Sequence, residues 1–545
     1  MGRVSLGKAL TSAAEDDQAP DTTESTGLRG PRLRTWAVAA VWVLGVVAAF
    51  ACYLRLARTR AVNSDGAGQA LQAWDMLHGN LLLHGWLLGD VSYYTTEVPQ
   101  YVLVEILRGL NADVVHVAAA MTYTLATLLA ALLAKGDSTG RQALVRVLIA
   151  VGIMLVPQLV SGVNILLSSP DHIGTAVPVM VVWLILDHAR PRWYIPVIAG
   201  AFLGWAMVAD MLVLYIGVLP LVLVCAIRVY RAVAVEREPL ASQRYDLALA
   251  AAALAGAALA VLALRLIHAH GGFYMPAPDA QFVQSGPALV HNLGIAAEGL
   301  LLLGGADFLG LRPTLGNAFI VLHVVGVFLA VWGTWLAARR FLRDRDLVAQ
   351  LLVTGVLINL VVYVFSTRAN VISQTHEIAP VLPFGAALAG RMLGGRLQAA
   401  KLVPILLVVL LGSLAGLAHE ITQPPVAAQN QRLTSWLEAR HLRTGLSGYW
   451  ESNIVTLTSG DRVQVRLVKP SGGRLVAGGY EAKADWYDPG RSTANFVVLS
   501  RGETGYPGFN SERAVLATFG PPAQTYHVGP YTILVWNRNL LPDLG

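Results

Sequence analysis

Long apolar segments recur along the chain and restrict its fold more than any other feature. A helix of ~20 apolar residues can cross a bilayer, and the sequence contains about eleven candidate spans, several of them shorter than this. They are Thr35–Leu54, Val114–Ala134, Ala143–Val160, Ile173–Leu186, Trp193–Val208, Met211–Val229, Leu247–Ile267, Asn317–Leu336, Leu347–Phe365, Ile378–Met392 and Leu402–Leu417. With 55% hydrophobic and 14% charged residues, the chain is predicted to be a polytopic α-helical membrane protein. Its formal charge of +6 is therefore no sign of nucleic-acid binding.

Basic residues in the loops between the spans predict the orientation. They concentrate in alternate loops, at Lys135, Arg141, Arg146, Arg190, Arg192, Arg228, Arg231, Arg237, Arg244, Arg339, Arg340, Arg343, Arg345, Arg391, Arg396 and Lys401. Loops rich in Lys and Arg stay in the cytoplasm, so the opposite loops are predicted to lie outside. These are residues 55–113, Ser161–His172, His268–Gly316 and Ser366–Glu377, together with the region after the last span. We expect a multi-pass plasma-membrane protein with a cytoplasmic N-terminus.

The first outer loop, Arg55 to Asp113, is too polar to span a bilayer and too apolar to be a free linker. From Ala67, the residues Ala67, Leu71, Trp74 and Leu77 recur at helical spacing. This pattern predicts a helix lying at the membrane surface, with Asp65, Gln69 and Gln72 on its polar face. Gly79-Asn80 ends it, and a second helix is predicted to run from Pro99 to Leu110.

The two ends of the chain differ from its middle. Residues 1–34 form a polar tail that we expect to be disordered. Residues 35–419 form the membrane domain, and residues 420–545 read as a small extracytoplasmic α/β domain. Its predicted strands are Asn453–Ser459, Arg462–Val468, Asn495–Ser500 and Tyr531–Asn537, and its predicted helices are Gln431–Leu442 and Ser511–Phe519.

Polar residues concentrate in the outer loops, which predicts a hydrophilic cavity at the membrane surface. Asp171 follows Pro170 at the mouth of a span, and the segment Ser366–Glu377 ends in His376-Glu377. A carboxylate there can act as a general base toward an acceptor hydroxyl. Nearby cations, or a divalent ion such as Mg²⁺ or Ca²⁺, can stabilise a departing phosphate.

The outer loops resemble those of the GT-C superfamily of membrane glycosyltransferases. The first loop opens with Asp65, continues as Met76-Leu77-His78-Gly79-Asn80 and Trp86, and reaches the cluster Tyr93-Tyr94-Thr95-Thr96-Glu97-Val98-Pro99. Asp171 matches the family's acid at a later span. Pro380 and Pro383, after His376-Glu377, match its late P-x-x-P helix. The resemblance covers about Thr35 to Met392 and is nearest to the protein O-mannosyltransferase and aminoarabinose-transferase branch, of an actinobacterial type.

The resemblance implies that a sugar moves from a polyprenyl-phosphate donor to a cell-envelope glycan, lipid or protein at the outer face. Asp65 would be the base or the metal-side acid, Asp171 its partner, and Glu97 a third catalytic group. Donor and acceptor would contact Arg58, Arg60, Tyr94, Arg368, His376 and Glu377. Two departures stand out: Glu97 lies where relatives often carry a cation next to a proline, and Gly66 replaces a second acid. A glutamate binds phosphate only with a metal ion or a proton.

Two other functions fit the same residues. A non-catalytic relative would use the cavity to bind a lipid-linked glycan, and a transporter or flippase would move one across the membrane. The acids also have structural readings. Asp65, Glu97 and Asp171 suit solvated helix starts, and Asp210 is either at a tight exposed turn or in mid-membrane. His268 and His270 are a weak candidate for a metal pair.

Overall fold

The computed structural model describes residues 30–155, 165–167, 172–277, 279–309, 318–428, 430–503, 506–507 and 509–545. The chain divides into two compact units, Met1–Ala48 and Ala49–Gly545. The first helix, α1 (Gly30–Ala57), begins in the first unit. Everything that follows concerns the second unit.

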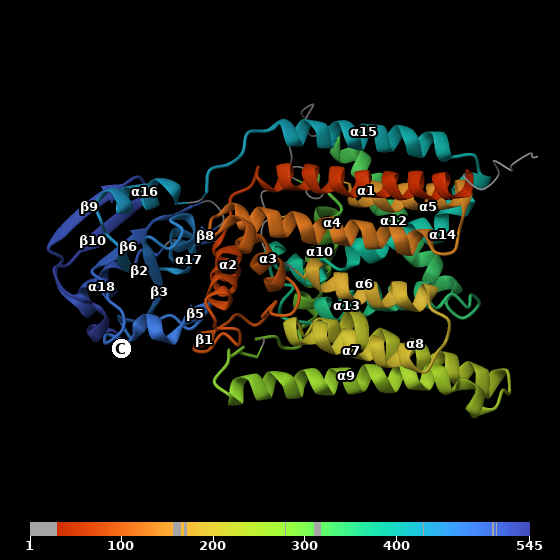
Figure 1. Cartoon of the computed structure of the whole chain (residues 1–545), viewed down its shortest axis with the longest axis horizontal. Coiled ribbons are helices and arrows are strands. Elements are labelled where there is room, and N and C mark those ends of the chain that lie inside the picture. Colours follow the sequence, from red (N-terminus) through yellow and green to blue (C-terminus); the bar gives the residue numbers. More distant parts are fainter. Residues whose placement is uncertain are drawn as a thin grey trace, which may run out of the picture. The chain divides into compact units, whose positions relative to one another are not determined.

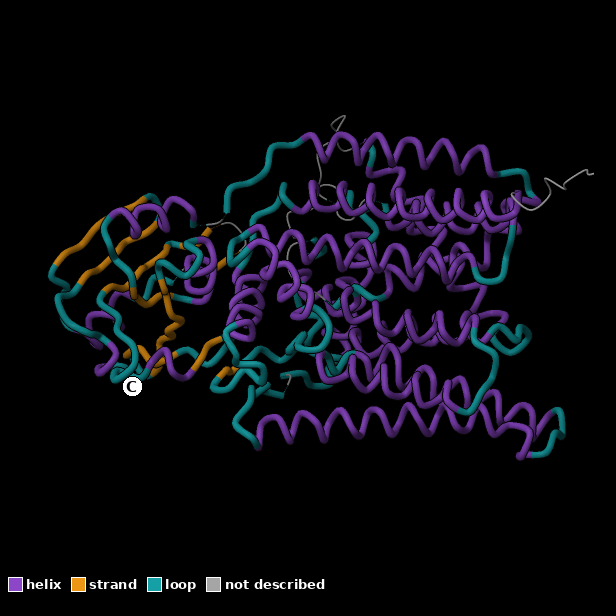
Figure 2. The backbone as a smooth tube through the Cα atoms, viewed as in Figure 1, coloured by secondary structure: helices purple, strands orange, loops and turns teal. Residues whose placement is uncertain are grey.

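Helices dominate the membrane domain (Figures 1 and 2). Among the described residues, eight helices are long and apolar enough to cross a membrane, or nine if the bent pair η5 (Ile372–Ile378) and α14 (Val381–Ala399) counts as one. The other long helices after α1 are α4 (Asp113–Lys135), α8 (Leu219–Tyr230, preceded by η2, Leu214–Val218, and followed by η3, Arg231–Val235), α9 (Arg244–Ala269, preceded by η4, Leu240–Gln243), α10 (Gly286–Leu303), α12 (Ile320–Arg340), α13 (Leu347–Val364) and α15 (Val403–Thr422). Shorter ones are α5 (Gly140–Met154), α6 (Ile173–His188) and α7 (Tyr194–Ala209). A polytopic helical membrane protein was predicted, and this is confirmed.

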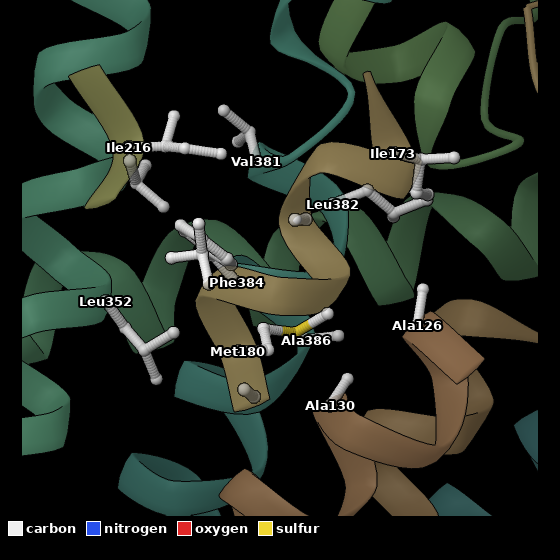
Figure 3. Close-up of a cluster of buried hydrophobic side chains, with 14 of the residues drawn as sticks. Ala126, Ala130, Ile173, Met180, Ile216, Leu352, Val381, Leu382, Phe384 and Ala386 are labelled. Carbon is white, nitrogen blue, oxygen red and sulfur yellow. The ribbon is translucent and has the colours of Figure 1, made fainter. Parts of the chain in front are cut away.

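Close packing of small and apolar side chains holds these helices together. Figure 3 shows part of the core, where Met180 of α6, Leu352 of α13 and Phe384 of α14 gather beside alanines of α4. Helices α7 and α9 come closest at Gly200 and Gly256. A Cβ on Gly200 would lie 2.3 Å from the carbonyl oxygen of Ala252, so only glycine allows this approach.

The first outer loop folds into two helices and a short strand against the C-terminal domain. They are α2 (Ser64–Leu77), β1 (Trp86–Leu87) and α3 (Val98–Arg108). Asn63 caps α2 by accepting a hydrogen bond from the Gly66 amide, and Pro99 occupies the first turn of α3. Both predicted helices are present.

The C-terminal domain is a six-stranded mixed sheet with helices. The strand order is β4-β3-β2-β6-β10-β9, where β2 pairs in parallel with β3 and β6 and the other pairs are antiparallel. The strands are β2 (Thr444–Ser447), β3 (Gln464–Ser471), β4 (Arg474–Ala477), β6 (Phe496–Ser500), β9 (Gln524–Val528) and β10 (Tyr531–Val535), with the short strands β5 (Ala482–Lys483), β7 (Gly502–Glu503) and β8 (Tyr506–Pro507). The helices are α16 (Gln431–Ala439), α17 (Tyr449–Thr458) and α18 (Glu512–Phe519), with the 3-10 turns η6 (Ala484–Tyr487) and η7 (Leu541–Asp543).

Specific contacts join this domain to the first outer loop. Strand β1 pairs with β5, with Trp86 opposite Lys483 and Leu87 opposite Ala482. Asp75 of α2 accepts hydrogen bonds from Trp86 Nε1 at 2.7 Å and from Lys483 Nζ at 3.1 Å. Helix α17 packs against α2. The membrane surface therefore carries one composite layer built from both segments, which we call the outer layer (α2, β1, α3, α17 and β5).

Three local predictions were wrong. Asn453–Ser459 was predicted as a strand because of its β-branched residues, yet it lies in α17, where Ile454, Val455 and Leu457 are fully buried. The outer loop His268–Gly316 contains α10, whose apolar run is diluted by Asn292 and Glu298. In addition, the face of α2 with Gln69 and Gln72 is buried rather than open to water.

Two predicted segments are described only in part. The span Ala143–Val160 is represented by α5, which ends at Met154, and residues 156–164 lie outside the described ranges. The polar tail 1–34 lies outside them up to residue 29.

Candidate functional site

Asp65 lies in the first turn of α2, where the C-terminal domain covers it. Its Oδ1 accepts a hydrogen bond from the Tyr449 hydroxyl of α17, and its Oδ2 accepts one from Asn63 Nδ2 at 3.1 Å. Burial raises the pKa of Asp65 although the Tyr449 hydrogen bond opposes it. Asp65 therefore lies at a helix start, as predicted, but it is partly buried and bonded to the C-terminal domain rather than fully solvated.

A second acid, Glu481, reaches the same tyrosine from the segment before β5. The Tyr449 hydroxyl lies 2.9 Å from Glu481 Oε2. Glu481 is only 4% exposed, and burial, followed by the nearby charge of Asp65, raises its pKa well above the ordinary value. Two carboxyl groups and one phenol therefore lie together, with Glu481 buried and Asp65 and Tyr449 partly exposed. We call them the tyrosine-bridged pair (Asp65, Tyr449, Glu481).

Glu97 precedes α3 and points inward. Its side chain is 1% exposed and makes no capping hydrogen bond to the helix. The neighbouring Thr96 hydroxyl donates to Oε2, whereas Oε1 is buried with no hydrogen-bond partner in the described part of the chain. Burial raises the pKa of Glu97 to about 8. At neutral pH this carboxyl group therefore carries a proton for most of the time.

His172 stands between two carboxylates beside Glu97. Its Nδ1 is 2.5 Å from Asp210 Oδ2, and its Nε2 is 3.3 Å from Glu377 Oε2. The His376 ring stacks on it with centroids 5.3 Å apart, and His376 Nδ1 is buried without a hydrogen-bond partner among the described residues. We call this group the histidine cluster (His172, Asp210, His376, Glu377).

Several groups hold Asp210 ionised. It is 2% exposed and accepts hydrogen bonds from the Thr175 hydroxyl and from the Leu212 amide at 2.8 Å. Burial alone would raise its pKa, but the charge of His172 and these hydrogen bonds outweigh burial and lower the pKa below its ordinary value.

Arg368 connects the two groups of acids. Its guanidinium forms an ion pair with Asp90 of the first outer loop and lies 3.9 Å from Glu377 Oε1. Asp90 in turn contributes to the electrostatic environment of Tyr480 and Glu481. Arg368 and Asp90 thus lie between the tyrosine-bridged pair and the histidine cluster, and we call all of these residues together the polar network.

Comparison with known proteins identifies the fold that carries this network. No family model and no curated protein sequence matches the chain. Among solved structures, ArnT from Cupriavidus metallidurans bound to undecaprenyl phosphate is similar over 91% of this chain and 98% of its own, with a TM-score of 0.53 at 14% identity. The apo form of the same protein is similar over 93% of this chain and 99% of its own, with a TM-score of 0.52 at 15% identity. An apo oligosaccharyltransferase from Archaeoglobus fulgidus covers 84% of this chain and 69% of its own, at 13% identity and a TM-score of 0.47.

The chain has the GT-C fold. At these identities the likeness to ArnT establishes the architecture, and the predicted resemblance is confirmed at that level. Within this GT-C fold, the polar network lies where the membrane helices meet the outer layer.

The structure brings most of the predicted site residues together, but not all. Asp65, Glu97, Arg368, His376 and Glu377 belong to or border the network. Asp171 lies outside the described residues.

Three predicted substrate-binding residues have other partners. Arg58 forms a bidentate pair with Asp113 at 2.7 and 2.8 Å. Arg60 is buried next to the charge of Glu420, and burial lowers its pKa. Tyr94 donates to the Leu81 carbonyl oxygen at 2.7 Å and packs on Phe273. These contacts anchor the outer loop, so a substrate role for the three residues stays a prediction.

Sequence reasoning missed four members of the network. Tyr449 and Glu481 lie in a separate domain, and nothing local to them indicates that they reach α2. His172 directly follows the predicted Asp171 and was passed over. Asp210 was predicted at an exposed turn or in mid-membrane; it is at a turn, but it is buried. A charged residue between two apolar spans is the sequence signal that indicates a functional position for Asp210. His268 packs on Tyr274, and His270 Nδ1 bonds the Leu266 carbonyl oxygen, so a metal role for these two histidines stays a prediction.

The histidine cluster also contains the ligand set of a metal site. Ligand atoms of His172, His376 and Glu377 all lie within 4.8 Å of one another. Two imidazoles and one carboxylate suit Zn²⁺ better than Mg²⁺ or Ca²⁺, which prefer oxygen ligands. Asp210 on Nδ1 of His172 is the outer partner that orients a metal-binding imidazole. The orphaned Nδ1 of His376 supports the same interpretation.

Proposed function

We propose that this protein transfers a sugar from a polyprenyl-phosphate donor to a hydroxyl of a cell-envelope acceptor at the outer face of the membrane. The observation that carries the proposal is the buried network of acids, histidines and Arg368 at the membrane surface of a GT-C fold. ArnT, which has the similar structure, is bound to undecaprenyl phosphate. A donor of this class carries an anionic phosphate, which its lipid chain would hold close to such a network.

Asp65 is the general base of the proposed reaction. It takes the proton from the acceptor hydroxyl as the acceptor oxygen bonds to the anomeric carbon. Its raised pKa brings proton affinity closer to neutral pH than an exposed aspartate would have.

Glu97 and Arg368 serve the leaving phosphate. A glutamate with a pKa of about 8 is mostly protonated at neutral pH, so Glu97 donates a hydrogen bond to a phosphate oxygen instead of repelling it. This supplies the proton that a glutamate at this position requires. Arg368, released from Asp90 or shared with it, adds a positive charge.

A metal ion in the histidine cluster fits the same role. His172, His376 and Glu377 would hold Zn²⁺, with Asp210 orienting His172. When bound, such an ion acts as a Lewis acid that neutralises charge on the leaving phosphate.

An apolar groove next to the network suits the lipid part of the donor. It is an open, apolar cavity between α10, α12, α13 and α14. Val381 and Leu382, which line it, follow Glu377 by only four and five residues. Val331 and Trp335 also line it, and they are 55% and 50% exposed. A prenyl chain in the groove would place its phosphate near the histidine cluster.

The outer face is proposed from the charges at the other end of the helices. Arg228, Arg345 and Arg391 lie there, paired with acids such as Asp246 and Glu236. An excess of arginine marks the cytoplasmic side. The network and the C-terminal domain then face outward.

Donor turnover in proteoliposomes tests the proposal. Wild-type protein is given synthetic polyprenyl-phosphate sugars and a cell-envelope extract, and mass spectrometry follows donor loss and product. We expect wild type to consume at least one donor and Asp65→Asn to lose ~10²–10⁴-fold in rate. Glu105→Gln is the matched control: Glu105 lies on α3, is 2% exposed and has a pKa raised by burial to about 9, and its carboxyl oxygens have no hydrogen-bond partner among the described residues. Folded wild-type protein that consumes no donor would refute the proposal and favour binding or transport, which a fluorescent-lipid flipping assay separates.

A further inference from the structure

One phenol lies between two carboxyl groups that come from different domains. Tyr449 Oη donates to Asp65 Oδ1 of the membrane domain and lies 2.9 Å from Glu481 Oε2 of the C-terminal domain. Glu481 is nearly inaccessible to water, whereas Asp65 is partly exposed. The number of hydrogen-bond donors that Asp65, Tyr449 and Glu481 need determines how many protons the three groups share.

A tyrosine hydroxyl has one proton and can donate one hydrogen bond at a time. If that proton goes to Asp65, the contact with Glu481 is favourable only when Glu481 carries a proton and donates to the phenol oxygen. Two bare carboxylates around one phenol would leave an uncompensated buried charge. The geometry therefore requires one additional proton in the trio.

The surroundings assign that proton to Glu481. Beyond Asp65 and Tyr449, the titratable groups that face it are Asp90 and Tyr480. Each acid has one amide partner, Asn63 on Asp65 and Gln69 on Glu481, but Glu481 is buried whereas Asp65 is partly exposed. The negative charge is thus better solvated on Asp65, and the proton is held on Glu481.

The fold holds Glu481 in place at a conformational cost. Its φ is +45°, in the left-handed region that non-glycine residues rarely adopt. Its carboxylate fills the space next to Gly68 of α2, where a Cβ would lie 2.1 Å from Oε2. Asn453 Nδ2 donates to its carbonyl oxygen at 3.1 Å, and the next residue begins the β1–β5 pairing. Such a cost at a buried acid is typical of functional sites rather than of packing.

We propose that the C-terminal domain completes the active site: a protonated Glu481 and Tyr449 act as positioning residues that keep Asp65 ionised and aimed at the acceptor. This rests on the proposed function for the role of Asp65, although the proton assignment does not. It gives the soluble domain a direct part in the chemistry. The Asp65 carboxylate receives one hydrogen bond from the phenol, which in turn receives one from the Glu481 carboxyl group.

Infrared difference spectroscopy tests the proton assignment without any activity. Spectra of wild-type and Glu481→Gln protein are recorded at neutral pH, with glutamate labelled by ¹³C. We expect wild type to show a protonated-carboxyl band that Glu481→Gln lacks and Asp65→Asn keeps. The bands of Glu97 and Glu105 cancel in the difference. A difference spectrum without this band would overturn the proposal, whether or not any donor is consumed.

Kinetics test the positioning role. Glutamine is neutral and can donate to the phenol oxygen, so Glu481→Gln should keep kcat within about threefold, whereas Glu481→Ala and Tyr449→Phe should lower it at least tenfold with donor KM little changed. Glu438→Gln is the control, because Glu438 is a half-buried acid of the same domain that pairs with Arg462 at the surface. A wild-type kcat in Glu481→Ala would overturn the role. Inactivity of every protein, wild type included, would count against the transferase proposal, and the infrared result would still decide the proton assignment.

Discussion

Buried charges gather at both ends of the membrane helices, and the two groups are built differently. At the end away from the C-terminal domain, Arg391 bonds Asp187 at 2.7 to 2.9 Å and Asp346 at 2.6 to 2.9 Å. In the polar network, acids outnumber cations, and Glu97 and His376 keep polar atoms without a partner among the described residues. Arg391 and its two acids are fully paired, and the polar network is not.

The difference separates stability from chemistry. Arg391, paired with its two acids, fixes the packing of α6, α13 and α14 and has no hydrogen-bond donor left for a ligand. Acids with raised pKa values and orphaned atoms are costly to fold and are tolerated where a substrate, metal or proton completes them. Variants at the two ends should therefore affect different measurements.

The largest effect on stability is expected at Arg391. Arg391→Met leaves Asp187 and Asp346 buried without their cation, which should cost ~3–5 kcal/mol in the free energy of unfolding. Thermal unfolding in detergent measures it. The triple variant Arg391→Met, Asp187→Leu, Asp346→Asn should recover most of the loss, because it removes the stranded charges and asparagine can still cap α13. If the triple variant stays as unstable as Arg391→Met, the loss of stability does not come from the unpaired charges of Asp187 and Asp346.

The next effect is expected at Glu97, and it is on catalysis. Glu97→Ala removes a phosphate donor and should lower donor turnover ~10²–10³-fold, whereas Glu97→Gln keeps a donor and should lose less. The wild-type rate should fall above pH 8, where Glu97 loses its proton, and the rate of Glu97→Gln should not.

The raised pKa of Glu97 also predicts how the free energy of unfolding depends on pH. Its pKa rises from 4.5 to about 8 on folding, so the folded state binds more protons between these values and stability should fall as pH rises through them. Unfolding temperatures of Glu97→Gln should decline less steeply over this range than those of wild type. Equal slopes would contradict the assigned pKa.

A smaller effect is expected from the partner of His172. Asp210→Asn should weaken Zn²⁺ binding ~10–100-fold, because the amide orients the imidazole less firmly and makes it less basic. Metal analysis after dialysis against graded chelator measures it. His376→Ala should abolish binding, and His419→Ala, at the end of α15, should not change it. Full zinc occupancy in His376→Ala would place any metal elsewhere.

The smallest effect is expected at Arg58. Its side chain is 34% exposed and pairs with Asp113, which also binds Arg108. Arg58→Met should cost at most ~1 kcal/mol of stability and leave donor turnover unchanged. A large loss of turnover with normal stability would restore Arg58 to the substrate site, as the sequence predicted.

Much of the fold could be read from local patterns. Apolar runs predict membrane helices because lipid demands internal hydrogen bonding and apolar surfaces, and short apolar runs with valines such as Phe496–Ser500 predict strands. Asp65, Glu97 and His376-Glu377 could be proposed because polar residues at the membrane surface are costly and follow a family pattern. Helix α17 could not be predicted, since its burial between the sheet and α2 overrides its β-branched composition.

The tertiary structure alone decided which groups meet. Asp65 and Glu481 are more than four hundred residues apart, and no local pattern records that one phenol joins them. The same holds for His172, Asp210 and Glu377, which come from three segments far apart in the sequence. Local sequence determines which segments become helices, strands or membrane spans. Burial and the approach of charges depend on the whole fold, and these set the pKa values and the chemistry of the site.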